Sequence, residues 1–308
     1  MALILDGRTA LAGAREGVVL CLVTVIPSLF PFFLLSHVAT GAFLKDPPKL
    51  LGPVAGLLGL PRGCEALTVS ALLGGYPAGA QGVAQGVSQG RLTRDQGARL
   101  LPVCNQPGPA FLFGMVAQLF PGKWAAWALW AIVILSAAVT ARILPAGRGD
   151  TPSLPVDESI SAPSPLRASL SAMASVCGWV VLFRVVLALG ERWMGWLLPG
   201  PVGVALAGVL ELSNGCLGLG AVGDLRVRFC LAAMTLAFGG LCVGLQTRAV
   251  AQGLGMKGYW MGKLLQAGLA LGMAGCLVYG FSWAIGAVFL IFLPSRQKRG
   301  GNSPAVGV

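Results

Sequence analysis

Polar side chains interrupt the apolar sequence at four places, and each interruption joins them to glycine or proline. The runs are LLGGYPAGA (residues 72–80), CNQPGP (104–109), LELSNG (210–215) and FGGLCVGLQ (238–246). Amides, a tyrosine hydroxyl and a carboxylate are groups that bind polar solutes. The chain has a single histidine, which leaves few options for acid–base catalysis. These residues therefore predict a binding function, with no enzyme activity and no cofactor.

The composition places these runs in a membrane. Hydrophobic residues make up 56% of the chain and charged residues 11%, with a mean hydropathy of +0.78. A soluble domain carries about 25% charged residues, so this chain cannot cover a water-facing surface. At about 20 residues per span, its length allows roughly seven to nine membrane-inserted segments. We predict an all-α polytopic membrane protein in contact with the lipid bilayer.

The net charge of +11 comes from Lys and Arg residues that lie mostly between apolar segments. Arg91, Arg94 and Arg99 share one connection, and residues 296–299 bring three more cations to the chain end. This pattern fits the positive-inside rule and argues against nucleic-acid binding. The eight cysteines are scattered without a C-x-x-C pair, so neither a metal site nor a disulfide framework is indicated.

The interrupted runs cannot face lipid, because hydrocarbon offers no partner for exposed backbone N–H and C=O groups. Discontinuous helices of this kind meet near the midplane of secondary transporters, where their ends direct partial charges at the solute. The alternative is close helix packing, for which glycine is common in membranes. The predicted pathway residues are Gly74, Gly75, Tyr76, Pro77, Gly79, Asn105, Gln106, Gly108, Pro109, Arg184, Glu211, Ser213, Asn214, Gly239, Gly240 and Gln246.

The two halves of the chain have the same order of segments. Each contains an apolar helix, a broken run, a basic connection and a second broken run. This order predicts two structural repeats, at residues 1–145 and 167–293, joined by a Pro/Ser-rich linker at 146–166. Residues 294–308 would form a basic, disordered cytoplasmic tail. Sequence identity between the halves is negligible, so the prediction rests on the pattern.

Two other segments have distinctive features. Pro27 and Pro31 lie one turn apart in the first apolar segment, where each removes a backbone donor, so we expect a kinked or split helix. Residues 123–144 form the plainest spanning segment. Trp124, Trp127 and Trp130 lie near one end of it, as interface anchors do.

Four ionisable residues lie within apolar segments. Glu211 is either a contact for a solute or coupling ion, or half of a fixed ion pair with Arg184. Arg184 lies mid-helix and is expected to face the protein interior, where it would complement an anion or neutralise Glu211. Lys263 lies close to the start of its segment and is expected to snorkel to the interface. His37 is expected to have an ordinary hydrogen-bonding role rather than to relay protons.

The motifs PSLFPFFLLSH, LLGGYPAGAQ, CNQPGPAFLFG, LELSNG and FGGLCVGLQ resemble, in order, the YlbJ-type (SpoVV) sporulation integral membrane proteins. These proteins carry paired nucleoside-recognition, or Gate, domains. The resemblance implies a transporter of dipicolinic acid, a small organic anion, in the cell membrane or outer forespore membrane. Arg184 would add a cation for this solute and Tyr76 an aromatic face for its ring.

Gate domains are distantly similar to concentrative nucleoside transporters. That similarity implies re-entrant hairpins with tips at residues 74–80 and 211–215, and unwound helices at 104–109 and 238–246. This chain departs from the nucleoside transporters in having Tyr76 and no acid in the first hairpin, which argues against a nucleoside. The alternatives are an ion-coupled transporter of nucleosides or other neutral solutes, and a non-transporting membrane scaffold. The coupling ion and any homo-oligomer stay open.

Overall fold

The computed structural model describes residues 6–43, 48–144, 164–194 and 200–280. Within these ranges the chain is helical and has no strand. Five helices of the described part are long and apolar enough to cross a membrane. They are Gly7–Phe43, Trp124–Ile143, Pro165–Trp193, Leu225–Val250 and Met256–Tyr279. The prediction of an all-α polytopic membrane protein is confirmed at this level, and the segment at 123–144 is among the candidate spans.

The first helix absorbs its prolines without splitting. α2 (Gly7–Leu20) continues through the π-helical turn η1 (Cys21–Val25) into α3 (Ile26–Phe43). The π-helical turn immediately precedes Pro27, where a regular α-helix would place the proline ring against the preceding turn. Of the kink or split expected here, the split does not occur, because a wider turn accommodates the proline and the helix goes on.

The rest of the first half consists of shorter elements up to its last helix. They are α4 (Leu51–Leu57), α5 (Leu67–Val69), η2 (Ser70–Gly74), α6 (Ala78–Ser88), α7 (Arg94–Cys104), α8 (Pro109–Phe111), η3 (Leu112–Val116), η4 (Ala117–Leu119) and α9 (Trp124–Ile143). Two interruptions stand out in this order, between η2 and α6 and between α7 and α8. They coincide with the GGYP and CNQPGP runs.

The second half begins with a long helix, α10 (Pro165–Met194). α11 (Pro201–Leu210), α12 (Leu212–Gly218), η6 (Leu219–Ala221), α13 (Leu225–Phe238), α14 (Gly240–Val250) and α15 (Met256–Tyr279) follow. α10 starts two residues before the end of the predicted linker, so residues 165–166 belong to the helix. The remaining linker residues up to 163 and the predicted tail lie outside the described residues.

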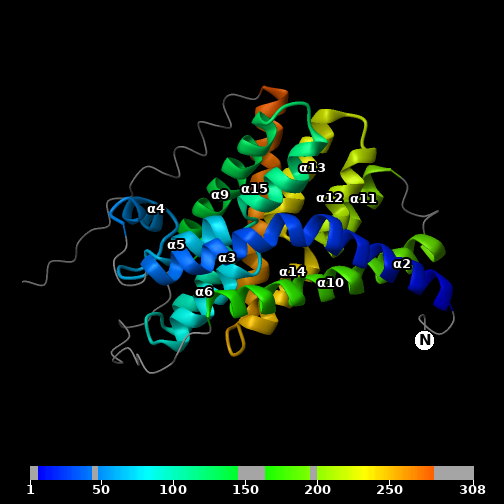
Figure 1. Cartoon of the computed structure of the whole chain (residues 1–308). Coiled ribbons are helices and arrows are strands. Elements are labelled where there is room, and N and C mark those ends of the chain that lie inside the picture. The colour runs from blue at the N-terminus through cyan, green and yellow to red at the C-terminus, as the bar shows by residue number, and fades with distance from the viewer. Residues whose placement is uncertain (1–5, 44–47, 145–163, 195–199, 281–308) are drawn as a thin grey trace, which may run out of the picture.

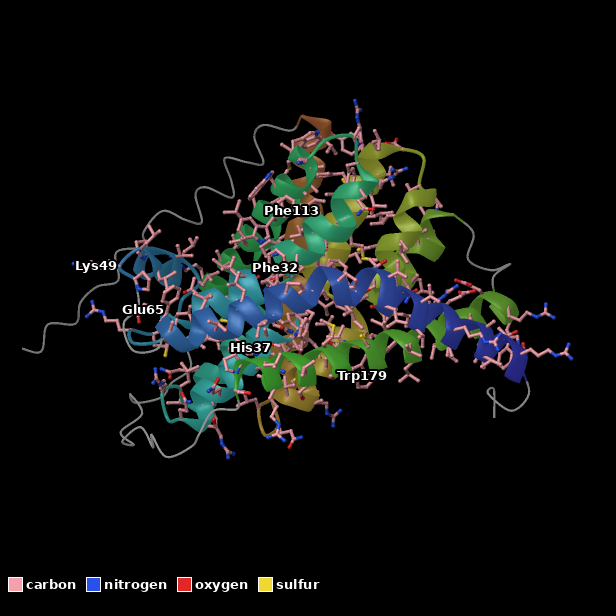
Figure 2. All side chains as sticks on the ribbon, viewed as in Figure 1. Phe32, His37, Lys49, Glu65, Phe113 and Trp179 are labelled. Carbon is pink, nitrogen blue, oxygen red and sulfur yellow. The ribbon has the colours of Figure 1, made fainter. Side chains whose placement is uncertain are left out.

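α2 and α3 together form one long helix that lies beside α10. This pair of long helices runs across the other helices (Figure 1). α9, α13 and α15 stand together on one side of them (Figure 1). His37 of α3 links α10 and α6, with Nδ1 at 3.2 Å from Ser169 Oγ of α10 and Nε2 at 3.3 Å from Gln81 Oε1 of α6. Figure 2 labels this histidine near the middle of the molecule, whereas Lys49 and Glu65 lie at its edge. The expected hydrogen-bonding role of His37 is confirmed.

Two arginines bind the two opposite ends of α9. The Arg99 guanidinium of α7 donates to the carbonyls of Ala141 and Leu144, at the C-terminal end of α9. The Arg228 guanidinium of α13 donates to the carbonyl of Leu119, just before α9 begins, at 2.7 Å. α7 and α13 therefore start at opposite ends of α9 and run toward each other.

Candidate functional site

A helix is interrupted at each of the four predicted places. α7 ends at Cys104, and the chain stays unwound until Pro109 starts α8. α11 ends at Leu210 and α12 starts at Leu212, with Glu211 extended between them. Between α13 and α14, Gly239 and Gly240 have φ of +81° and +83°, a conformation that side chains with Cβ rarely adopt. The choice of glycine in the FGG run follows from this turn.

In each half, the first broken run packs on the second. A Cβ placed on Gly75, beside the first tip, would lie 2.9 Å from the Gly108 amide nitrogen. A Cβ placed on Gly240 would lie 3.4 Å from both the Leu210 carbonyl oxygen and the Leu212 amide nitrogen of the second tip. The four breaks are thus brought together from separate parts of the sequence.

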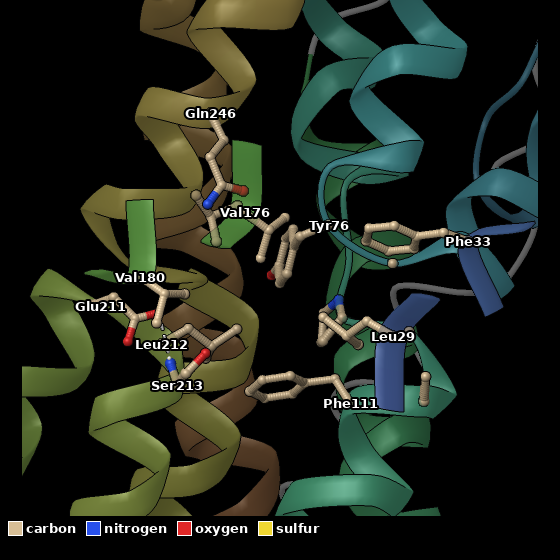
Figure 3. Close-up of a pocket in the computed structure, with 16 residues that line it drawn as sticks. Leu29, Phe33, Tyr76, Phe111, Val176, Val180, Glu211, Leu212, Ser213 and Gln246 are labelled. Atoms are coloured by element: carbon tan, nitrogen blue, oxygen red, sulfur yellow. Dashed lines mark hydrogen bonds between the residues drawn. The ribbon is translucent and has the colours of Figure 1, made fainter. Parts of the chain in front are cut away.

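A narrow pocket lies between the two halves at these breaks (Figure 3). Figure 3 shows Phe33, Tyr76 and Phe111 of the first half on one side of it. Glu211 and Gln246 of the second half lie on the other side (Figure 3). The cavity volume is about 40 Å³. This corresponds to room for about three water molecules.

Glu211 is the one charged residue in the pocket lining of the described chain. Its side chain is held by the start of α12: Oε1 accepts from the Ser213 amide at 2.9 Å, and Oε2 accepts from the Asn214 amide at 2.7 Å. The Asn214 side-chain amide adds a second bond to Oε2 at 2.7 Å. The N-terminal N–H groups of a helix stabilise a carboxylate in this position. Glu211 is only 2% exposed, and no Lys or Arg of the described residues forms an ion pair with it.

Arg184 does not pair with Glu211, and that alternative is wrong. Its guanidinium forms ion pairs with Glu16 of α2 and, at 3.2 Å, with Glu191 of its own helix. Both glutamates are more than half exposed. Arg184 therefore joins the two long helices outside the pocket, and the expectation that it faces the site is wrong as well.

Gln246 brings an unsatisfied polar group to the pocket. Its Nε2 donates to Cys242 Sγ at 3.2 Å, and its Oε1 has no partner among the described residues although the side chain is only 3% exposed. A buried acceptor without a partner is costly, so native proteins use such groups where water or a ligand completes the bond. Gln246 is thus suited to accept a hydrogen bond from a solute.

Lys263 lies directly behind the pocket wall and is 0% exposed. Its Nζ is 3.4 Å from the hydroxyl of Tyr76, which lines the pocket, and 2.6 Å from the carbonyl oxygen of Asn105. The expectation that it snorkels to the interface is therefore wrong. The α15 face that carries it packs on α7, where a Cβ on Gly262 would lie 2.7 Å from the Pro102 ring, so the lysine stem has no path to solvent.

The amides of the CNQPGP run build the wall rather than the lining. Asn105 Nδ2 donates to Thr247 Oγ1 at 2.7 Å. Gln106 Nε2 donates to the Pro102 carbonyl at 2.6 Å, and Gln266 Nε2 donates to the same oxygen at 2.9 Å. The two bonds to Pro102 satisfy a carbonyl that the end of α7 leaves without a helical partner.

The predicted pathway residues fall into three groups. Those that line the pocket are Gly74, Gly75, Tyr76, Gly108, Glu211, Ser213 and Gln246. Those at the breaks but outside the lining are Pro77, Gly79, Asn105, Gln106, Pro109, Asn214, Gly239 and Gly240. Arg184 lies away from the pocket.

Sequence reasoning missed the buried stripe of α15 that carries Tyr259, Lys263 and Gln266. A signal for it exists, because the spacing i, i+4, i+7 puts three polar groups on one face of an apolar helix. Thr247 was also missed, although it directly follows Gln246 at the end of the FGG run.

Comparisons with protein-family models, with curated proteins and with solved structures find no match for the chain. The resemblance to the YlbJ-type proteins stays a prediction. Among the described residues no group of histidines, cysteines and carboxylates is arranged to hold a metal ion.

Proposed function

We propose that this protein is a membrane transporter that moves a small polar organic solute through the pocket between its two halves. The observation that carries the proposal is the pocket itself, which lies where four broken helices meet. It combines apolar and aromatic walls with the Glu211 carboxylate and the Gln246 side-chain oxygen, which has no partner among the described residues. Solute sites are built from a mostly apolar lining with a few placed polar groups.

The opposed directions of the broken helices support two inverted repeats. α7 starts beside the end of α9, and α13 starts beside its beginning. α15 starts near Ala98 of α7, and its last residue, Tyr279, lies under the Arg226 guanidinium at 5.6 Å, so α15 runs opposite to α9. Transporters with inverted repeats place the solute between the repeats and expose it alternately to the two sides.

The charge of the pocket favours an uncharged solute with hydrogen-bond donors. The described lining contains a carboxylate and no Lys or Arg, since Arg184 lies elsewhere and Lys263 is behind Tyr76. A dianion such as dipicolinate would meet Glu211 in a poorly solvated space, where like charges repel strongly. Of the two solute classes expected from the sequence, the neutral class is better supported, although Tyr76 stands where nucleoside transporters carry an acid.

The size of the pocket implies motion during transport. Space for about three waters does not hold a solute the size of a nucleoside, so we infer that the described conformation is a closed one. Opening requires the hairpin tips to move relative to the long helices that carry Leu29, Val176 and Val180.

Uptake into proteoliposomes tests the proposal. Labelled nucleosides and dipicolinate are offered to the wild type, Glu211→Gln and Gln246→Leu. For a neutral solute we expect each variant to lose roughly tenfold or more in kcat/KM, the usual consequence of losing a hydrogen bond to a buried polar group. Glu65→Gln and Gln118→Leu are matched controls, because both side chains lie outside the pocket lining and only bond to nearby backbone.

The outcomes separate the hypotheses. Faster dipicolinate uptake by Glu211→Gln than by the wild type would favour the anion transporter, because only an anion gains when the carboxylate is neutralised. If wild-type protein moves neither solute class and both pocket variants behave like their controls, the proposed pathway is wrong. A non-transporting scaffold is then the better hypothesis.

A further inference from the structure

The Lys263 ammonium occupies a site that is made of oxygen atoms from both broken helices. The main-chain oxygens are those of Asn105, 2.6 Å from Nζ, and Ala237, 3.3 Å away. Side-chain oxygens complete the shell, with Gln266 Oε1 at 3.1 Å, Gln106 Oε1 at 3.2 Å and the Tyr76 hydroxyl at 3.4 Å. The Tyr76 ring centroid lies 5.2 Å from the nitrogen. All five oxygens belong to uncharged groups.

The helix directions explain why a cation is stable at this point. Asn105 follows the last residue of α7, and Ala237 is next to the last residue of α13. The C-terminal ends of both helices, with their partial negative charges and free carbonyls, therefore converge on one nitrogen. No described carboxylate bonds to Lys263, so the helix ends and amides are the groups that stabilise its charge.

We propose that Lys263 is a built-in cation that fills the place an inorganic cation would take between the two broken helices. In transporters with discontinuous helices, unwound carbonyls and half-helix C-termini coordinate the coupling ion. Here the fifth oxygen, of Tyr76, belongs to the first hairpin tip, so the same nitrogen joins both broken helices to the pocket wall. A covalently held ammonium makes a bound monovalent cation unnecessary at this site. The link to transport rests on the proposed function, whereas the cation replacement does not.

The distances indicate which cations would replace the ammonium. An ammonium and a potassium ion have similar radii, and the shell around Nζ lies mostly at 3.1–3.4 Å. Truncation of the side chain to Ala would leave five oxygens around an empty space. We expect K⁺, or propylammonium, which restores the missing atoms of the side chain, to bind there better than Na⁺.

Thermal unfolding of the purified full-length protein in detergent tests this without any transport assay. Wild type, Lys263→Ala and Lys263→Met are compared in KCl, NaCl, propylammonium chloride and choline chloride at one ionic strength. The wild type should have the same apparent Tm in all four salts. Lys263→Ala should be less stable in choline and should gain roughly 3–5 °C as K⁺ or propylammonium approaches ten times its dissociation constant. Lys263→Met is the matched control, because its uncharged side chain refills most of the space that Lys263→Ala empties and so blocks the entry of a cation.

Two results would overturn the proposal. One is a saturable rise in the Tm of the wild type with K⁺ or Na⁺ over choline, which would mean that an inorganic cation still binds the protein. The other is a Lys263→Ala protein that responds no more to K⁺ or propylammonium than Lys263→Met does. If Lys263→Ala cannot be purified, the wild-type comparison still decides, since the proposal requires it to be indifferent to the salt. Failure of the uptake experiments would leave both results intact.

Discussion

Replacing Gly79 by Ala should destabilise the protein more than the same change at a helical glycine that has space for a Cβ. Gly79 is the second residue of α6, and it faces the end of α7. A Cβ at this position would lie 2.8 Å from the Cys104 carbonyl carbon and 3.2 Å from Asn105 Cα, with the Cys104 carbonyl oxygen closer still. These are backbone atoms, so no rotamer change relieves the contact.

The magnitude follows from this overlap. Carbon atoms in contact are separated by about 3.5–4.0 Å, so α6 has to withdraw from α7 by on the order of 1 Å. Overpacking of this kind costs about 1–3 kcal/mol, and the shift also disturbs Asn105, whose carbonyl holds Lys263. With about 2–4 °C of Tm per kcal/mol for a chain of this order of size, we expect a fall of roughly 4–10 °C.

Apparent Tm values at one scan rate provide the measurement, since unfolding of a membrane protein in detergent is commonly irreversible. Gly268→Ala in α15 is the control, because its Cβ meets nothing within 4 Å, and better helix propensity should leave the Tm equal or slightly higher. Gly82→Ala in α6 should lie between the two, since its Cβ meets only side-chain atoms, at 3.2 Å or more. If Gly79→Ala and Gly268→Ala had the same Tm, the close packing of α6 on the end of α7 would be refuted.

Two further substitutions test the surroundings of the site. Thr93→Ala removes the capping box at the start of α7, in which Thr93 Oγ1 accepts from the Gln96 amide at 3.1 Å and Gln96 Oε1 accepts from the Thr93 amide at 2.9 Å. Thr93→Ala should lower the free energy of unfolding by about 1 kcal/mol, which is roughly 2–4 °C of Tm. An equal fall in the Tm of Ser88→Ala would contradict this. Arg184→Gln should leave KM for the transported solute unchanged, because the arginine pairs with partly exposed glutamates outside the pocket. A loss of uptake as large as that of Glu211→Gln would show that Arg184 belongs to the solute site.

The breaks were predictable from the sequence because their causes are local. Proline cannot donate to the preceding turn, and paired glycines permit backbone angles that other residues avoid. The runs at GGYP, CNQPGP and FGG each place two or more such residues together, so a regular helix through them is unfavourable. Glu211 was predictable for a similar reason, since a carboxylate followed by two free N–H groups caps the helix that starts beside it.

The outcome at Pro27 depends on packing as well as on local sequence. A proline within a long apolar helix permits a kink, a split or a wider turn, and the choice depends on how the helix packs. Here the π-helical turn packs on α10, where Cys21 Sγ lies 3.7 Å from the Cys177 carbonyl oxygen. The partner lies 156 residues away in the sequence, so no local pattern contains this information.

Arg184 and Lys263 exchanged their expected roles, and the reason is geometric. The position of a residue along its helix gives its distance from the ends of that helix, which is not its depth in the protein. Arg184 is central in α10, but α10 extends alongside α2, where the exposed carboxylates of Glu16 and Glu191 meet it. Lys263 is eight residues into α15, yet the C-terminal ends of α7 and α13 come to the same level and enclose it. A broken helix ends inside the protein, so the partial charge of its end lies in the core. Hydropathy cannot locate this position. The residue that fills this position has to be found from where the neighbouring helices stop.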